Sequence, residues 1–186
     1  MSEPARRLAT PDDLLALPDH VVGEIVGGEL HVHPRPAARH GMAASALGGE
    51  LCPPFTRGRG GPGGWILLDE PELRLEADVV VPDLAGWRRE RMPELPDVAF
   101  FELAPDWVCE VLSPSTARFD RHEKRAIYAH AGVPWIWWVD PASELLEVLE
   151  LDGDSYRVQA THAGDVRARA EPFAAVEIEL GALWAR

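Results

Sequence analysis

The segment Asp106-Trp-Val-Cys-Glu-Val-Leu-Ser113 decides the fold, because its β-branched and aromatic residues are typical of a buried strand. Glu110 stands in the middle of this run, between Cys109 and Val111. A carboxylate is unfavourable in such a place unless a cation, a proton or a shifted pKa compensates for its lost hydration. The segment therefore predicts a buried strand whose central acid has a partner.

A second apolar run, residues 78–87, also has the character of a strand and carries Asp83 directly after Pro82. An aspartate after a proline at a strand end is often only a turn residue. Two neighbouring strands that each present one acid, however, can hold a metal ion between them.

The segment 117–131 follows a Ser-Pro turn and has helical spacing, with Lys124 four residues after Asp120. Lys124 alone is explained by a solvated helical ion pair with Asp120. Together with Asp83 and Glu110, it completes the components of a phosphodiesterase site that uses a divalent metal. The combination carries the prediction, and no single residue does.

Five ordered motifs resemble the Uma2 family of endonucleases, which has the restriction-endonuclease-like PD-(D/E)xK fold. They are Gly23-Glu-Ile-Val-Gly-Gly-Glu-Leu30, Val80-Val-Pro-Asp83, Cys109-Glu-Val-Leu-Ser-Pro-Ser-Thr116, the set Asp120, Lys124 and Tyr128, and Gly132-Val-Pro-Trp-Ile-Trp-Trp-Val-Asp140. The resemblance implies an α+β fold, a mixed β-sheet core flanked by helices with additional β-hairpins. Gly23 and Trp135 depart from the family pattern.

The resemblance also implies site residues and an activity. Asp83 and Glu110 are then the metal-binding acids and Glu24 is an additional acid. The superfamily lysine lies two residues after the second acid, where this chain has Leu112, so Lys124 takes its role from the following helix. The expected activity is metal-dependent hydrolysis of phosphodiester bonds in nucleic acid, with DNA as the expected substrate.

The expected cofactor is Mg²⁺ or Mn²⁺, because these ions take one or two carboxylates and keep several waters. Asp83, Glu110 and the main-chain carbonyl of Val111 are the expected ligands. Lys124 is expected to steady the attacking water or the negative charge that develops on phosphorus. Tyr128, one turn beyond Lys124, is either a hydroxyl donor to the site or a packed helix residue.

Length and composition predict one domain over residues 1–186, since 186 residues with 46% hydrophobic content can bury a substantial core. Cys52 and Cys109 lie in apolar surroundings and are expected to be reduced thiols, as in a cytoplasmic protein. The sequence contains neither an apolar run long enough for a membrane span nor the pattern of a signal peptide.

The net charge of −13 opposes tight, non-specific binding to DNA, so any nucleic-acid substrate is expected to bind weakly. Three clusters of basic residues could still hold a substrate near the site, or could be ordinary solvated faces. They are Arg57 and Arg59; Arg88, Arg89 and Arg91; and Arg118, Arg121, Lys124 and Arg125.

Two other functions compete with a nuclease. One is a catalytically inactive interaction module of the same fold, which the acidic charge favours and the intact acid–lysine set disfavours. The other is a zinc hydrolase that uses His31 and His33, on one face of a strand, together with His40.

The remaining sequence predicts further elements and a homodimer. We expect a helix over 10–17, a hairpin of 21–26 and 29–33, a helix over 39–51 that Pro53 and Pro54 end, a lid-like excursion over 88–101 and a strand over 173–180. The homodimer is expected because four tryptophans exceed what one small core needs, so some should be exposed: Trp135, Trp137, Trp138 and Trp184.

Overall fold

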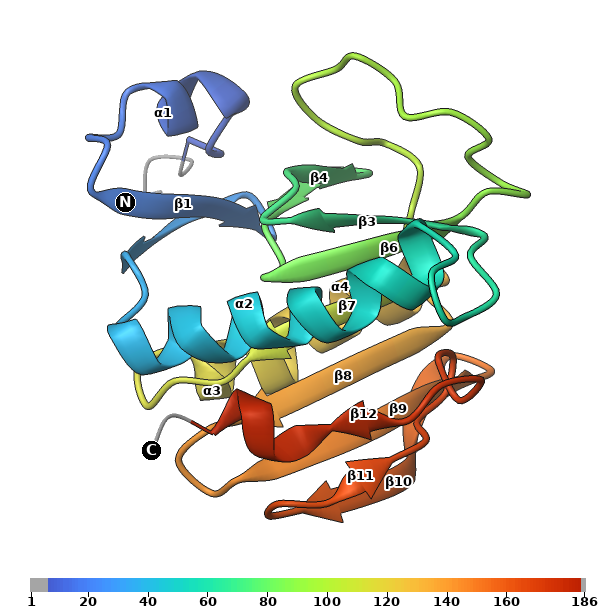
Figure 1. Ribbon diagram of the computed structural model, residues 1–186. Coiled ribbons are helices and arrows are strands. Elements are labelled where there is room, and N and C mark those ends of the chain that lie inside the picture. The colour runs from blue at the N-terminus through green and yellow to red at the C-terminus, as the bar shows by residue number, and fades with distance from the viewer. Residues whose placement is uncertain (1–6, 185–186) are drawn as a thin grey trace.

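The computed structural model describes residues 7–184, which form a mixed six-stranded sheet, a smaller four-stranded sheet and helices around them (Figure 1). The helical segments are α1 (Pro11–Leu15), α2 (Ala38–Leu51), the π-helical turn η1 (Cys52–Thr56), α3 (Ala117–Phe119), the π-helical turn η2 (Asp120–Lys124), α4 (Arg125–His130) and the 3-10 helix η3 (Leu180–Leu183). The strands are β1 (Val21–Val26), β2 (Glu29–Pro34), β3 (Trp65–Asp69), β4 (Leu73–Leu75), β5 (Asp78–Val80), β6 (Leu84–Arg88), β7 (Trp107–Val111), β8 (Trp135–Asp140), β9 (Leu145–Asp152), β10 (Ser155–Ala163), β11 (Arg167–Ala168) and β12 (Ile178–Glu179).

The six-stranded sheet has the order β10-β9-β8-β7-β6-β3, and β7 lies near its centre. Strands β7 and β8 run parallel, with Glu110 opposite Trp138, and the helices α3 to α4 make the crossover between them. The two parallel strands and the helices between them therefore form a β-α-β unit. Helix α2 lies over one face of this sheet and α4 lies behind the other, so β7 is buried on both faces (Figure 1).

Each face of the six-stranded sheet carries its own hydrophobic core. Under α2, Trp107 and Trp137 pack against Phe173 with ring centroids 4.9 and 5.5 Å away. On the opposite face, Tyr128 and Trp138 belong to a second core. Side chains alternate along β7, so Glu110 points to the face on which α4 lies, and Cys109 and Val111 point to the α2 face.

Burial of the tryptophans corrects an expectation from the sequence. Trp137, Trp138 and Trp184 are all buried, and Trp135 is half-buried. Both faces of β8 are covered, so alternation along the strand turns Trp137 into one core and Trp138 into the other. None of these tryptophans is exposed, so the argument for a homodimer loses its basis.

The run 78–87 is not one strand. Strand β5 pairs with β1 and β4 in the smaller sheet, whereas β6 pairs with β3 and β7 in the larger one. Pro82 lies between the two strands. It has no N–H to donate, so a continuous strand through this position would lose one hydrogen bond to its neighbour. The chain therefore crosses from one sheet to the other at Val81, Pro82 and Asp83.

Most other elements agree with the sequence, and two do not. Strands β1 and β2 form the predicted hairpin, with φ of 58° and 76° at Gly27 and Gly28, as its two-residue turn requires. The two prolines do not stop the second helix at residue 51, because the helix continues through the wider turn η1. The expected strand over 173–180 shrinks to β12, because turns occupy the residues before it and η3 follows it directly. Within residues 7–184, no helix is long and apolar enough to cross a bilayer.

Gly86 in β6 is a position where a side chain would not fit. A Cβ atom there would lie 2.7 Å from Leu67 and 3.3 Å from the rings of both Trp65 and Trp107. We expect Gly86→Val to lower the free energy of unfolding by about 1–3 kcal/mol, because a close-packed core tolerates extra volume poorly. Urea denaturation measures this.

Gly49 in α2 is the matched control, since a Cβ there meets nothing within 4 Å. Gly49→Ala should raise the free energy of unfolding by about 0.5–1 kcal/mol through helix propensity. Equal effects from the two substitutions would contradict the packing described for Gly86.

Candidate active site

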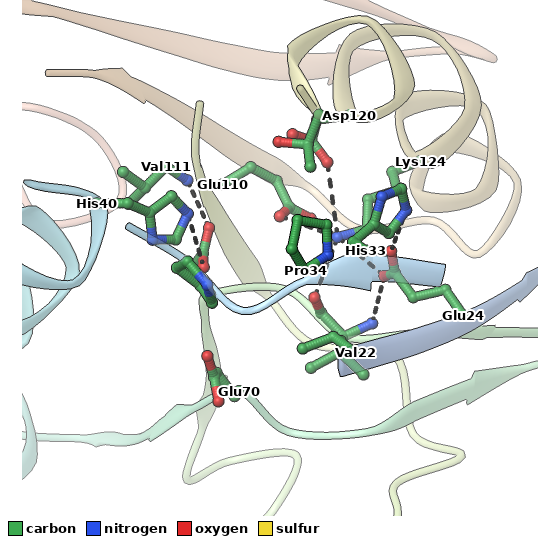
Figure 2. A pocket seen from close by; sticks show the side chains of 14 residues that line it. Val22, Glu24, His33, Pro34, His40, Glu70, Glu110, Val111, Asp120 and Lys124 are labelled. Carbon is green, nitrogen blue, oxygen red and sulfur yellow. Dashed lines mark hydrogen bonds and ion pairs between the residues drawn. The ribbon is translucent and has the colours of Figure 1, made fainter. Parts of the chain in front are cut away.

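A small pocket opens where the two sheets meet, beneath the start of the crossover helices (Figure 2). Its volume is ≈ 60 Å³, which gives room for a few water molecules, so it can hold an ion or a phosphate oxygen but no nucleobase. The acidic and basic side chains that line it are Glu24, His33, His40, Glu70, Asp83, Glu110, Asp120 and Lys124. The four site residues expected from the sequence, Glu24, Asp83, Glu110 and Lys124, are thus brought together.

These side chains come from elements that are distant in sequence. Glu24 reaches the pocket from β1 of the smaller sheet, and Glu110 from β7 of the larger one. Asp83 stands on the crossing segment just before β6, and its carboxylate accepts a hydrogen bond of 2.7 Å from the N–H of Val111. This bond places Asp83 next to Val111, whose main-chain carbonyl was also expected to be a ligand, and next to Glu110, which precedes Val111 on β7.

Lys124 lies at the centre of the acids and is 3% exposed. Its ammonium nitrogen is 3.0 Å from the carboxylate of Glu24, 3.0 Å from that of Glu110 and 3.7 Å from that of Asp120. It also donates a 3.0 Å hydrogen bond to the carbonyl of Val81. An ammonium group has three N–H donors, so these contacts use all of them. The interpretation of Lys124 as one half of a solvated ion pair with Asp120 is therefore wrong, because this pair is buried.

Glu110 is held from two sides. The ammonium of Lys124 contacts its carboxylate, and the hydroxyl of Tyr128 donates a 2.6 Å hydrogen bond to Oε1. Tyr128 is also fully packed, so both interpretations of this residue apply at once. Two donors fix the orientation of the one acid that the central strand carries.

Burial and the charges of neighbouring acids raise the pKa values of two of the acids, Glu110 and Asp120. Burial raises the pKa of Glu110 well above its usual value, and Asp120, Asp83 and Glu24 raise it further against the opposing charge of Lys124. Burial likewise raises the pKa of Asp120 to about 6. Burial lowers the pKa of Lys124, but the charges of Glu110, Glu24 and Asp120 outweigh it and keep the ammonium protonated. The pocket thus has more negative charge than one lysine neutralises.

Three further residues, His40, His33 and Asp120, join the acid cluster without having been expected there. His40 comes from the first turn of α2, with Nε2 3.2 Å from Oδ1 of Asp83, and His33 comes from β2, with Nε2 3.7 Å from Oε2 of Glu24. Figure 2 shows the two histidines on different sides of the pocket. Asp120 precedes Lys124 by one helical turn, a spacing that could have suggested its place.

Lys124 is the only lysine in the sequence, so all the other residues among the 18 lysines and arginines are arginines. Exposed basic positions in this chain are therefore filled by arginine, and the one lysine is placed in the pocket. Composition alone thus distinguishes Lys124 from every other basic residue, and this signal could have strengthened its assignment.

Of the three basic clusters, only Lys124 lines the pocket, whose lining residues include no arginine. Several of these arginines are held elsewhere: Arg91 pairs with Asp106, Arg121 with Glu147 over the ring of Trp138, and Arg125 donates to the carbonyl of Tyr156. They stabilise the fold and the flanks of the helices.

The zinc arrangement of three histidines does not form. His31 and His33 both pack against Phe119 with tilted rings, whose centroids are 4.8 and 5.1 Å from its own, whereas His40 lies beside Asp83. Among residues 7–184, no three His, Cys, Asp or Glu side chains are close enough together to hold a metal ion by themselves. A site of two carboxylates and the Val111 carbonyl needs no third side chain of these types, which suits an ion that keeps several waters.

Comparison with known proteins identifies similar chains. The profile of the family described as "Uma2: Putative restriction endonuclease" matches residues 11–182. The crystal structure of a putative nuclease belonging to DUF820, from Anabaena variabilis ATCC 29413, is similar with a TM-score of 0.69 and 20% sequence identity, over 93% of this chain and 96% of that chain. A search of curated proteins found no match. The structural likeness confirms the predicted α+β, restriction-endonuclease-like fold.

Proposed function

Because this chain belongs to the Uma2 family of restriction-endonuclease-like proteins, we propose that its acidic pocket hydrolyses phosphodiester bonds of nucleic acid with the help of a divalent metal ion. The observation that carries the proposal is the convergence of Asp83, which directly precedes β6, and Glu110, on the adjacent strand β7, beside a buried lysine. DNA is the proposed substrate.

The residues present suit a divalent cation. Five carboxylates line the pocket, and Lys124 is the one permanently charged base among its lining residues. A phosphodiester is itself an anion, so it would be repelled from this pocket unless a further cation offsets the acids. Burial is the main cause of the raised pKa of Glu110, and the neighbouring acids Asp120, Asp83 and Glu24 raise it further.

We assign the ion to Asp83, to the main-chain carbonyl of Val111 and to Glu110, which reaches it directly or through one of the ion's waters, and we propose Mg²⁺ or Mn²⁺. Such an ion would polarise the phosphodiester and lower the pKa of a water molecule. The N–H of Val111 fixes the carboxylate of Asp83, while Tyr128 and Lys124 fix that of Glu110. These donors hold both carboxylates in place before any ligand arrives, which reduces the reorganisation needed for catalysis.

Lys124 has a positioning role in this proposal, with a positive charge that can also act on the substrate. Its three donors already serve Glu24, Glu110 and Val81. Lys124 can donate to the attacking water or to a phosphate oxygen only if it gives up its hydrogen bond to one of these three acceptors. Glu24 and Glu110 would each keep another donor, since Oε1 of Glu24 also accepts from the N–H of Val81 at 2.8 Å and Oε1 of Glu110 accepts from the hydroxyl of Tyr128.

Cleavage assays test the proposal directly. Purified protein is incubated with supercoiled plasmid, single-stranded DNA or RNA, each with Mg²⁺, with Mn²⁺ or with EDTA. We expect nicking or cutting that appears with either ion and disappears with EDTA. Folded protein that binds Mn²⁺ and cuts none of these substrates would favour the inactive interaction module instead, and cleavage of RNA alone would correct the substrate.

A further inference from the structure

His40 interacts with two residues that are assigned to the ion, Asp83 and Val111. Its Nε2 lies 3.2 Å from Oδ1 of Asp83. Burial lowers the pKa of His40, but the carboxylate of Asp83, together with Asp120 and the main chain of Val111, raises it by more. The imidazole is thus placed over the edge of the pocket that carries the Asp83 carboxylate and Val111.

Within residues 7–184, the imidazole of His40 forms no ion pair other than the one with Asp83. The side chain of His40 is 12% exposed, and Nδ1 is buried without a hydrogen-bond partner among residues 7–184. His40 lines the pocket, and Nε2 is its ring nitrogen beside the carboxylate of Asp83.

The spacing of His40 and Asp83 suits a shared ion. Two ligands that each lie about 2.1 Å from an octahedral ion, at right angles to each other, are about 3.0 Å apart. The observed separation of 3.2 Å between Nε2 and Oδ1 matches that spacing. A cation entering between them would replace the nitrogen–carboxylate contact with two coordination bonds and would move neither residue far. Because the ion keeps several waters, Glu110 can reach it through one of them without leaving Lys124 and Tyr128.

We infer that His40 is an additional ligand of the ion, through Nε2, and that the site prefers Mn²⁺ to Mg²⁺. This inference rests on the proposed function, because it assumes the ion held by Asp83, Glu110 and Val111. Imidazole nitrogen is a good ligand for transition metals, whereas Mg²⁺ selects oxygen and retains its water. A site with one nitrogen among its oxygens therefore discriminates between two ions that an all-oxygen site holds more equally.

Pulsed electron paramagnetic resonance of bound Mn²⁺ tests the ligand without any measurement of activity. A directly coordinated imidazole gives a ¹⁴N coupling to the manganese electron spins. We expect this coupling in the wild-type protein and its loss in His40→Ala. Calorimetry should show at least about a tenfold loss of Mn²⁺ affinity in that variant and a smaller difference between Mn²⁺ and Mg²⁺.

His33→Ala is the matched control, because His33 lines the same pocket but contacts Glu24, 3.7 Å away, and not Asp83. The ¹⁴N coupling should persist in it. If His40→Ala folds poorly, as circular dichroism would show, His40→Gln keeps a side chain of similar length and must also lose the coupling.

The possible failures are distinct. Mn²⁺ that binds the wild type, is lost in Asp83→Asn and shows no ¹⁴N coupling would overturn the His40 assignment and leave the proposed nuclease site intact. Coupling that disappears in His33→Ala and persists in His40→Ala would also overturn it. Absence of Mn²⁺ binding to the wild type would overturn both the ligand assignment and the proposed function.

Discussion

Replacing Glu110 with glutamine should reduce metal-supported cleavage by at least about 100-fold while the protein stays folded. Glutamine keeps the shape of the side chain but removes the negative charge that the ion needs. Its carbonyl oxygen can accept from Lys124, and the hydroxyl of Tyr128 can turn to accept from the amide. The measurement is the rate of plasmid nicking under saturating Mn²⁺, together with the melting temperature.

The melting temperature of Glu110→Gln should equal or exceed that of the wild type at pH 7. Burial raises the folded-state pKa of Glu110 above its unfolded value, so the stability this acid provides is greatest at low pH and declines as the pH rises above that unfolded value. A neutral glutamine escapes this decline. A marked fall in melting temperature with undiminished Mn²⁺ binding would show that Glu110 is structural.

Glu150→Gln is the control for the same chemical change elsewhere. Glu150 forms an ion pair with Arg157 at the surface, far along the sheet on β9. This variant should cleave at the wild-type rate. Asp83→Asn should resemble Glu110→Gln in its loss of activity, since both acids are assigned to one ion.

Replacing Lys124 with methionine should lower the free energy of unfolding of the metal-free protein by about 3–5 kcal/mol, because it leaves buried carboxylates without their cation. Glu24, Glu110 and Asp120 lie within 3.0 to 3.7 Å of the ammonium that is lost. Methionine is similar in length and adds no cavity of consequence. Urea denaturation with EDTA present measures the change.

A double variant keeps this prediction decisive even if Lys124→Met does not fold. Adding Glu24→Gln removes one of the unpaired charges, so Glu24→Gln with Lys124→Met should be more stable than Lys124→Met alone. Arg157→Met, which breaks an exposed pair, should change the free energy of unfolding by less than about 1 kcal/mol. Similar losses for Lys124→Met and Arg157→Met would contradict the central place of Lys124.

The sequence predicts much of the fold because local patterns and tertiary structure agree over long stretches. The hairpin of β1 and β2 follows from Gly27-Gly28, and the β7-to-β8 crossover follows from two apolar runs around a helical one. The single strand over 78–87 failed because apolar character does not say which sheet a strand joins. The expectation that one of Trp137 and Trp138 is exposed failed because both faces of their strand are covered, so alternating side chains enter two different cores.

The site was predictable to the extent that its residues are chemically conspicuous. Glu110 is an acid within an apolar strand, and its need for a partner is what singles out Asp83 and Lys124 as site residues. His40 could not be assigned to the acids, because its relation to Asp83 depends on how α2 crosses the sheet, and one histidine in a helix has no pattern of its own. The inward placement of Lys124 likewise depends on the smaller sheet, which supplies Glu24.

Placing the single lysine in the acid cluster also determines how this protein reacts with amine-directed reagents. Such reagents attack uncharged amines, and the ε-amino group of Lys124 is both buried and held protonated by its neighbours. In the native protein this group is therefore shielded, and no second lysine exists to compete for the reagent. Acylation at Lys124 therefore marks the molecules whose pocket has opened, and peptide mass spectrometry can follow the modified fraction over time at one residue.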